Sequence, residues 1–379
     1  TKMIENPFKY GQIVSGNYFT DREKEIEEIK LDLLSGQNLI IYSPRRYGKT
    51  SLILKVLREL RKRKVICIYI DLFKVFSKLR FAEVYSAGIA REISTKRKDF
   101  LQVLRDILPS IIPKVTVKGD NLPTFEIEYV RKEVDVDRLL SRLYEQPQII
   151  ASKRKKRVVV VFDEFQEVRN ISQGEIEKEL RSAVQHHQDV AYVFMGSKRH
   201  LIDLLFFNKK EPLYLIGKHL PLGKIPAQNL SKFISQRFAF TGINIKQDKI
   251  QFILDVTQCH PYYTQALCHE IWNLALGSKN VTSENIKSAI AQLIFREAYA
   301  YTTIWDSLTA KQQSFLFALT KEKEAKVLSK DFVNRYNLES TSTVQKIVKS
   351  LVKREIIERI NNSYSIRDLF FAEWIKREI

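Results

Sequence analysis

One stretch of the sequence has the residue types and the spacing of a phosphate-binding loop. It runs Ser43-Pro44-Arg45-Arg46-Tyr47-Gly48-Lys49-Thr50, with Ser51 following. The stretch matches Gly-x4-Gly-Lys-Ser/Thr at every fixed position except the first, where serine replaces glycine. In such a loop, backbone N–H groups and a helix N-terminus surround the phosphates of a nucleotide. We therefore expect the residues from Ser43 to Ser51 to bind ATP.

Individual positions of this loop have specific expected roles. Lys49 would neutralise the β- and γ-phosphates, which makes it a binding and a catalytic candidate, and the Thr50 hydroxyl would coordinate Mg²⁺. Gly48 would let the backbone approach the ligand closely. At Ser43, glycine would tolerate backbone angles that serine disfavours, so we expect the loop to keep its shape at some cost in stability. ATP and Mg²⁺ are thus the expected cofactors.

A second candidate element is a continuous apolar run, Val158–Phe162, which ends in Asp163 and Glu164. Such a run is typical of a strand buried on both faces, and ligands bind at the carboxyl ends of parallel strands. We expect Asp163 to hold the metal ion and Glu164 to act as the general base. Another strand, 191–195, precedes Ser197. We expect Ser197 to contact the γ-phosphate or the attacking water, with an ordinary strand-ending turn as the alternative.

The elements that would position these residues are those of a parallel α/β sheet. A strand at 38–42, the loop, a helix at 48–62 and a strand at 65–72 form a βαβ unit. Farther along, residues 114–118 and 124–129 alternate apolar with polar side chains around a turn-forming Gly-Asp-Asn, which predicts a hairpin.

The last part of the chain has a different pattern. It contains helical stretches at 309–319, 329–336 and 340–354, then a hairpin-like pair at 356–360 and 364–366. Helices followed by a small ribbon are typical of a winged helix-turn-helix. The spacing predicts that the 340–354 helix buries Val344, Ile347, Val348 and Leu351.

Several blocks of sequence together resemble a known family. They are Asn6-Pro7-Phe8 with Gly16, Phe19 and Arg22-Glu23; Ser43–Thr50; Asp163–Glu167; Gly196–Arg199; and His260-Pro261-Tyr262-Tyr263. In this combination the chain resembles the archaeal-type ATPase family of AAA+ P-loop NTPases. That family is related to STAND ATPases and to archaeal origin-recognition initiators. The resemblance covers nearly the whole chain.

The resemblance implies a fold class and a domain order. An α/β AAA+ core with a parallel sheet would occupy 1–225, a helical lid 226–304 and a C-terminal winged helix-turn-helix domain 305–379. It also implies that Arg22 lies near the adenine. His260 and Pro261 would occupy the lid position that contacts nucleotide, where many AAA+ proteins carry an arginine.

Composition limits the partners. Lysine and arginine number 63 against 44 acidic residues, a net charge of +19, which favours polyanionic partners. The odd number of cysteines, Cys67, Cys259 and Cys268, argues against a disulfide framework. No apolar run approaches the about 18 residues that span a bilayer, and the N-terminal residues show no secretory signal. We expect a cytoplasmic protein with no membrane partner.

Two functions fit these features. In the first, an ATPase couples ATP binding and hydrolysis to duplex DNA binding through the winged helix. In the second, a STAND-like nucleotide-gated switch uses the winged helix to dock a protein partner. A protein partner or a homo-oligomer is open in both cases, because winged helices also mediate protein contacts.

The DNA-binding hypothesis names its own residues. In helix-turn-helix proteins the recognition helix enters the major groove and flanking cations contact phosphates. The candidates on this helix and the wing are Thr343, Gln345, Lys346, Lys349, Lys353 and Arg359. Because no arginine or asparagine lies near the helix start, we expect duplex binding with weak sequence preference.

Two further basic runs precede strands of the predicted sheet. One comprises Arg58, Arg61, Lys62, Arg63 and Lys64, and the other comprises Lys153, Arg154, Lys155, Lys156 and Arg157. If both strands are parallel members of one sheet, both runs lie at its N-terminal edge and form an anion-binding patch. Two solvated loops are the alternative.

Overall fold

The computed structural model describes residues 5–14, 16–19, 22–94, 102–103, 111–118, 124–131, 135–322, 326–360 and 363–379. The chain divides into two compact units, one of Asp21–Lys224 and one of Thr1–Thr20 with Ile225–Ile379. The predicted bounds of the core, lid and winged helix stay a prediction.

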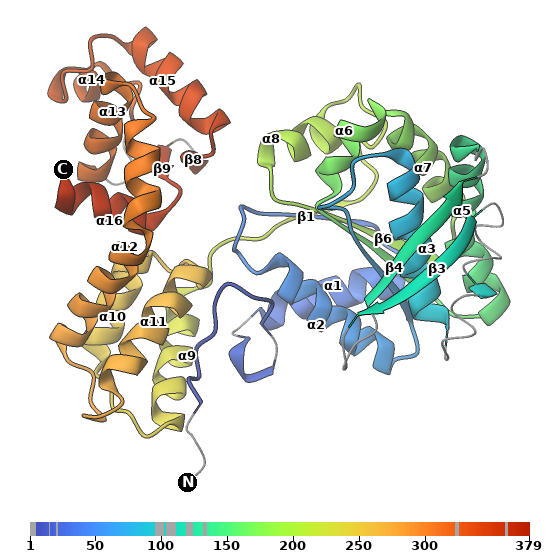
Figure 1. Cartoon of the computed structure of the whole chain (residues 1–379), viewed down its shortest axis with the longest axis horizontal. Helices are drawn as coiled ribbons and strands as arrows, with labels where there is room; N and C mark the ends of the chain where they lie inside the picture. The colour runs from blue at the N-terminus through green and yellow to red at the C-terminus, as the bar shows by residue number, and fades with distance from the viewer. Residues whose placement is uncertain are drawn as a thin grey trace. The chain divides into compact units, whose positions relative to one another are not determined.

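A parallel five-stranded sheet, to which β1 and β6 belong, forms the centre of the Asp21–Lys224 unit (Figure 1). Its strands lie in the order β2-β5-β6-β1-β7. Its strands are β1 (Leu39–Tyr42), β2 (Ile66–Asp71), β5 (Val158–Asp163), β6 (Val190–Gly196) and β7 (Lys218–Pro221). Every residue of β5 is buried, which explains its continuous apolar sequence. This order brings the carboxyl ends of β1, β5 and β6 together at one edge.

Helices cover both faces of the sheet. On one face α1 (Glu23–Ser35) and α2 (Lys49–Lys62) pack on the strands, and Cys67 of β2 contacts the Leu57 carbonyl of α2. On the other face α3 (Lys78–Ile93) places Phe81 and Tyr85 against Phe162 of β5. The other helices of this unit are α5 (Val136–Arg154), η2 (Phe165–Val168), α6 (Arg169–Ser172), α7 (Glu175–His186), α8 (Arg199–Ile202) and η3 (Asp203–Phe207).

The predicted hairpin is confirmed. Strands β3 (Ile111–Lys118) and β4 (Thr124–Arg131) pair antiparallel. The Gly119-Asp120-Asn121 turn lies outside the described residues.

A bundle of helices begins the second unit: α9 (Ala227–Phe240), α10 (Gln247–Thr257), α11 (Pro261–Ala275) and α12 (Ser283–Asp306). The N-terminal segment, which includes η1 (Gly16–Tyr18), packs on this bundle. Phe8 is fully buried against Phe233 and Phe238, and the Asn6 amide donates to the His269 carbonyl. The Asn6-Pro7-Phe8 segment therefore anchors the N-terminal residues to the bundle.

The predicted winged helix forms the C-terminal part. It consists of α13 (Ala310–Lys321), α14 (Lys330–Arg335), α15 (Thr341–Lys353), the antiparallel pair β8 (Ile357–Ile360) and β9 (Ser363–Ile366), and α16 (Leu369–Glu378). The predicted inner face of α15 is confirmed, since Val344, Ile347, Val348 and Leu351 are buried. None of the helices in the described part of the chain has the length and apolar character needed to cross a membrane.

Candidate nucleotide site

The loop between β1 and α2 has the backbone shape of a phosphate-binding loop. Arg46 and Gly48 have positive φ angles of 68° and 86°. Gly48 is the N-cap of α2 and provides no side-chain cap, so the first N–H groups of the helix are available to an anion. Ser43 is not among the residues with positive φ. The expected strain at Ser43 was therefore wrong: this position does not need glycine.

The Lys49 ammonium is held inside this loop. Lys49 is 6% exposed, and its Nζ donates to the Ser43 carbonyl at 2.9 Å and to the Pro44 carbonyl at 3.2 Å. Both partners are neutral carbonyl oxygens, and the Asp163 carboxylate also interacts electrostatically with Lys49.

A hydrogen bond joins the loop to the end of β5. The Thr50 hydroxyl donates to Asp163 Oδ2 at 2.8 Å, across 113 residues of sequence. The Tyr69 hydroxyl of β2 donates to the same oxygen at 2.7 Å. Burial raises the pKa of the Asp163 carboxyl, and the hydrogen bonds from Tyr69 and Thr50 oppose this rise. A hydroxyl and a carboxylate side by side are a hard-oxygen donor set of the kind that Mg²⁺ prefers.

Glu164 lies next to this pair at the sheet edge. Its backbone is left-handed (φ 53°), and its N–H donates to Asp163 Oδ1 at 2.9 Å. The Ser197 hydroxyl, at the end of β6, donates to Glu164 Oε2 at 2.8 Å. The Gln166 Nε2 donates to the same carboxylate oxygen. The structure thus brings Thr50, Asp163, Glu164 and Ser197 together.

Close packing accounts for the glycine before Ser197. A Cβ at Gly196 would lie 2.3 Å from Ile202 Cδ1 and 2.5 Å from Gln166 Oε1. Any side chain at residue 196 would displace Gln166, and through it the Glu164 carboxylate.

Ion pairs extend this network away from the loop. Lys198 Nζ contacts Glu167 at 2.9 Å, and Arg169 forms two hydrogen bonds to Glu211, at 2.8 and 3.1 Å. They connect the segment after β5 to the segment after β6. The two strand ends that carry Glu164 and Ser197 are therefore fixed relative to each other.

The sequence analysis did not identify Tyr69 and did not give Gln166 a role. No spacing rule connects Tyr69 to Asp163, because their contact crosses from one strand to the next. The only sequence feature that points to Gln166 is its place two residues after the Asp163-Glu164 pair.

The remaining nucleotide candidates have structural partners. Arg22 is buried, and its guanidinium contacts the Gly223 carbonyl at 2.6 Å and Glu25 at 2.8 Å. His260 is the N-cap of α11 and accepts a hydrogen bond from the Tyr262 N–H at Nδ1, with Pro261 at the first helical position. His260 and Pro261 belong to the unit that does not carry the loop, so their contact with nucleotide stays a prediction.

The DNA-binding candidates lie on α15 and β8. Gln345, Lys346, Lys349, Lys353 and Arg359 are exposed. Thr343 is half-buried, and its N–H and hydroxyl contact the Ser340 cap. The helix therefore presents a basic face opposite its buried apolar face.

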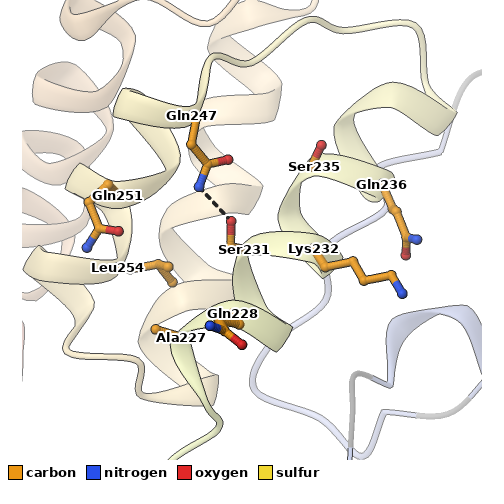
Figure 2. Close-up of a pocket in the computed structure, with 9 residues that line it drawn as sticks. All are labelled: Ala227, Gln228, Ser231, Lys232, Ser235, Gln236, Gln247, Gln251 and Leu254. Carbon is orange, nitrogen blue, oxygen red and sulfur yellow. Dashed lines mark hydrogen bonds between the residues drawn. The ribbon is translucent and has the colours of Figure 1, made fainter.

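A polar depression of about 440 Å³ lies between α9 and α10 (Figure 2). Its lining consists of Ala227, Gln228, Ser231, Lys232, Ser235, Gln236, Gln247, Gln251 and Leu254. Gln247 Nε2 donates to Ser231 Oγ at 2.9 Å across it. No carboxylate or loop residue lines this depression, so it is not the phosphate site.

Comparisons with known proteins agree with this architecture. The family described as "ATPase domain predominantly from Archaea" matches residues 19–263, and the family described as "Probable winged helix domain" matches residues 299–377. None of the curated proteins matches the chain.

Solved structures resemble the chain over nearly its whole length. A Walker-type ATPase of Pyrococcus abyssi has a TM-score of 0.64 at 15% identity, with 95% of this chain and 96% of that chain covered. ORC2 of Aeropyrum pernix, solved as ADPNP–ADP complexes, has a TM-score of 0.58 at 13% identity, with 97% of this chain and 96% of that chain covered. ORC1 of Aeropyrum pernix, in complex with DNA, has a TM-score of 0.52 at 14% identity, with 99% of this chain and 98% of that chain covered. The predicted fold class, an AAA+ core followed by a winged helix, is confirmed.

Proposed function

The chain belongs to the family of ATPase domains found predominantly in Archaea, and from that premise we propose that it binds and hydrolyses MgATP and binds duplex DNA. One observation carries the hydrolytic part. The Thr50–Asp163 hydrogen bond joins the phosphate-binding loop to the carboxylate pair at the end of β5. Both halves of an ATPase site therefore meet at one sheet edge.

Each residue has a proposed role in the reaction. Lys49 and the backbone N–H groups of the loop from Arg45 to Ser51 bind the phosphates. Thr50 and Asp163 hold Mg²⁺, which would neutralise charge on the β- and γ-phosphates. Glu164 accepts a proton from the attacking water, and Ser197 orients the Glu164 carboxylate through their 2.8 Å hydrogen bond. Arg22, His260 and Pro261 are proposed contacts on the nucleoside side.

Phosphate release from ATP, measured with and without duplex DNA, tests the whole proposal. We expect Mg²⁺-dependent turnover that changes when DNA is added. A chain that binds ATP but turns over identically with and without DNA would separate the ATPase from DNA coupling. The STAND-like switch with a docked protein partner would then be favoured.

Tyr69 provides a test of the metal ligand. In Tyr69→Phe the Asp163 carboxylate loses a hydrogen bond that fixes its orientation, while the ring packing is kept. Because a hydrogen bond to a charged group contributes about 1.5–3 kcal/mol, we expect MgATP to bind about 10- to 100-fold more weakly. Isothermal titration with and without Mg²⁺ measures this change.

The control for Tyr69→Phe is Tyr192→Phe, which removes a buried strand hydroxyl bonded to His187 instead. Metal-free ATP should bind to both variants as it binds to the parent. An equal loss of affinity with and without Mg²⁺ in Tyr69→Phe would remove Tyr69 from metal positioning.

The DNA-binding part rests on the winged helix. The exposed face of α15 carries Lys346, Lys349 and Lys353. The helix contains no acidic residue, and the next one along the chain is Glu355. Lysine is a compact point charge that suits phosphates, and no arginine or asparagine lies near the start of this helix to read base edges. We propose duplex binding with weak sequence preference.

The double variant Lys346→Ala/Lys349→Ala tests this interface. Each lost phosphate contact should lower the slope of log affinity against log salt by about one unit. We expect a drop of about two units, similar on unrelated duplexes, with unchanged ATP affinity. Fluorescence anisotropy over a salt series measures the slope.

Lys232→Ala/Lys287→Ala removes two exposed helix lysines from the same unit and serves as the matched control. If Lys346→Ala/Lys349→Ala binds DNA as this control does, α15 is not the DNA-binding helix. A protein partner would then be the better candidate for the winged helix.

A further inference from the structure

The Asp21–Lys224 unit has a basic surface at the amino-terminal ends of its strands, opposite the nucleotide site. We define the basic surface as Lys62, Arg63, Lys64, Lys153, Arg154, Lys155 and Lys156, all of which are exposed. The prediction that the two basic runs share one edge is confirmed, because β2 and β5 are parallel neighbours. Both runs immediately precede these strands.

Backbone contacts hold the two runs side by side. The Ile66 N–H donates to the Arg157 carbonyl at 3.0 Å, and Ile66 pairs with Val158 in the sheet. Neighbouring strands lie about 4.8 Å apart, so the two turns that carry Lys64 and Lys156 are adjacent. Arg154 Nη2 also donates to the Ile93 carbonyl at the end of α3, at 2.8 Å.

Little acidic charge balances this surface. Glu92 is paired with Arg61 at 2.9 Å, and Asp189 lies exposed at the start of β6. Within the described ranges of the chain, no carboxylate forms an ion pair with a member of the basic surface. The Glu59 carboxylate of α2 interacts electrostatically with Lys62, so the fold balances the positive charge of this surface only in part.

Stability of the fold does not account for these cations. A cation at a helix C-terminus contributes about 0.3–1 kcal/mol through the helix dipole. However, Lys64 and Lys155 have left-handed backbones, with φ of 65° and 52°, where glycine or asparagine is favoured. Close like charges also repel one another. The left-handed backbones and the repulsion between like charges both oppose the gain from the helix dipole, which favours a role in binding over one in stability.

We propose that the basic surface is a second nucleic-acid-binding surface, which contacts the phosphodiester backbone and is separate from the winged helix. The surface offers a spread of flexible cations, which suits a chain of phosphates better than one small anion. Its members are all charged, so it has no apolar side chain to insert into a bilayer. A backbone polyanion is therefore the better match.

The test removes three charges without straining the backbone. Asparagine tolerates the left-handed region, so the variant is Lys64→Asn/Lys155→Asn/Lys156→Gln. Binding of a 30-base-pair random duplex to the full chain is measured by anisotropy over a salt series. We expect the salt slope to fall by about three units and the affinity at low salt to fall at least about tenfold.

The matched control removes three exposed cations elsewhere in the same unit, as Lys24→Gln/Arg142→Gln/Lys178→Gln. This control should change the slope by less than one unit, and both triple variants should keep the parent's ATP affinity. Equal DNA binding by the two triple variants would overturn the proposal. So would loss of binding to phosphatidylserine vesicles with DNA binding unchanged, which would assign the surface to membranes.

The result is separable from the winged-helix proposal. If the basic-surface variant weakens DNA binding and Lys346→Ala/Lys349→Ala does not, the basic surface is the DNA site and the winged helix is not. The opposite pattern would keep the winged helix and remove the basic surface.

Discussion

Lys49→Ala is expected to lower ATP affinity by about 100- to 1000-fold. A charge pair at about 4 Å near a protein surface contributes roughly 4 kcal/mol, and only part of this is recovered when water replaces the ammonium. In the structure the Lys49 Nζ lies at the loop carbonyls of Ser43 and Pro44, at the centre of the phosphate site. Isothermal titration with MgATP measures the loss.

The burial of Lys49 requires a second variant. Removing the side chain leaves the Ser43 and Pro44 carbonyls without this donor and opens a gap, so Lys49→Ala is also expected to reduce stability. Lys49→Met keeps the aliphatic stem and removes only the charge. If Lys49→Met folds, as judged by thermal unfolding, and binds ATP like the parent, Lys49 is not a phosphate ligand.

The strands that carry the site were predictable because their sequences are unambiguous. A run of four valines before Phe162 suits a strand buried on both faces. β7 was missed, since Lys218-His219-Leu220-Pro221 alternates weakly and ends in proline. Its place in the sheet comes from pairing with β1, which no local pattern encodes.

Helix ends were predictable where a side chain caps them. The side chains of Thr309 and Ser340 each accept a hydrogen bond from the backbone N–H three residues farther along. Their position just before an apolar helical stripe predicts this capping role. α16 was missed although Asp368 caps it by accepting from the Phe370 and Phe371 N–H groups. α5 runs from Val136 to Arg154 and contains Pro147, which is unfavourable inside a helix and hides the second half of α5 from a reading of local pattern.

The site was predictable to the level of motifs, and its finer geometry was not. The loop and the carboxylate pair have fixed spacing. In contrast, the Tyr69–Asp163 contact depends on which strands are neighbours, and the Gln166–Glu164 contact depends on the left-handed turn at Glu164. Contacts of this kind depend on which strands are neighbours and on how the chain turns between them. Local sequence patterns do not encode either, so these contacts could not be predicted.

Glu164→Gln should keep ATP binding and lose turnover by about 100- to 10,000-fold, the usual contribution of a general base. The amide has the same shape as the carboxylate, and its oxygen can still accept the Ser197 hydrogen bond, so the site geometry is expected to persist. It cannot accept a proton from water at neutral pH. Phosphate release under saturating MgATP measures turnover, and isothermal titration measures binding.

The matched control for this variant is Glu145→Gln, which removes a carboxylate of the same unit that contacts His187. Because Glu145 does not belong to the group of Thr50, Asp163, Glu164 and Ser197 or to the ion pairs that fix it, turnover in Glu145→Gln should stay within a few-fold of the parent. Retained hydrolysis in Glu164→Gln would remove this residue from the base role. Since Asp163 is hydrogen-bonded to Thr50 and Tyr69, the water would then have to be activated by the phosphates themselves or by a group outside this edge of the sheet.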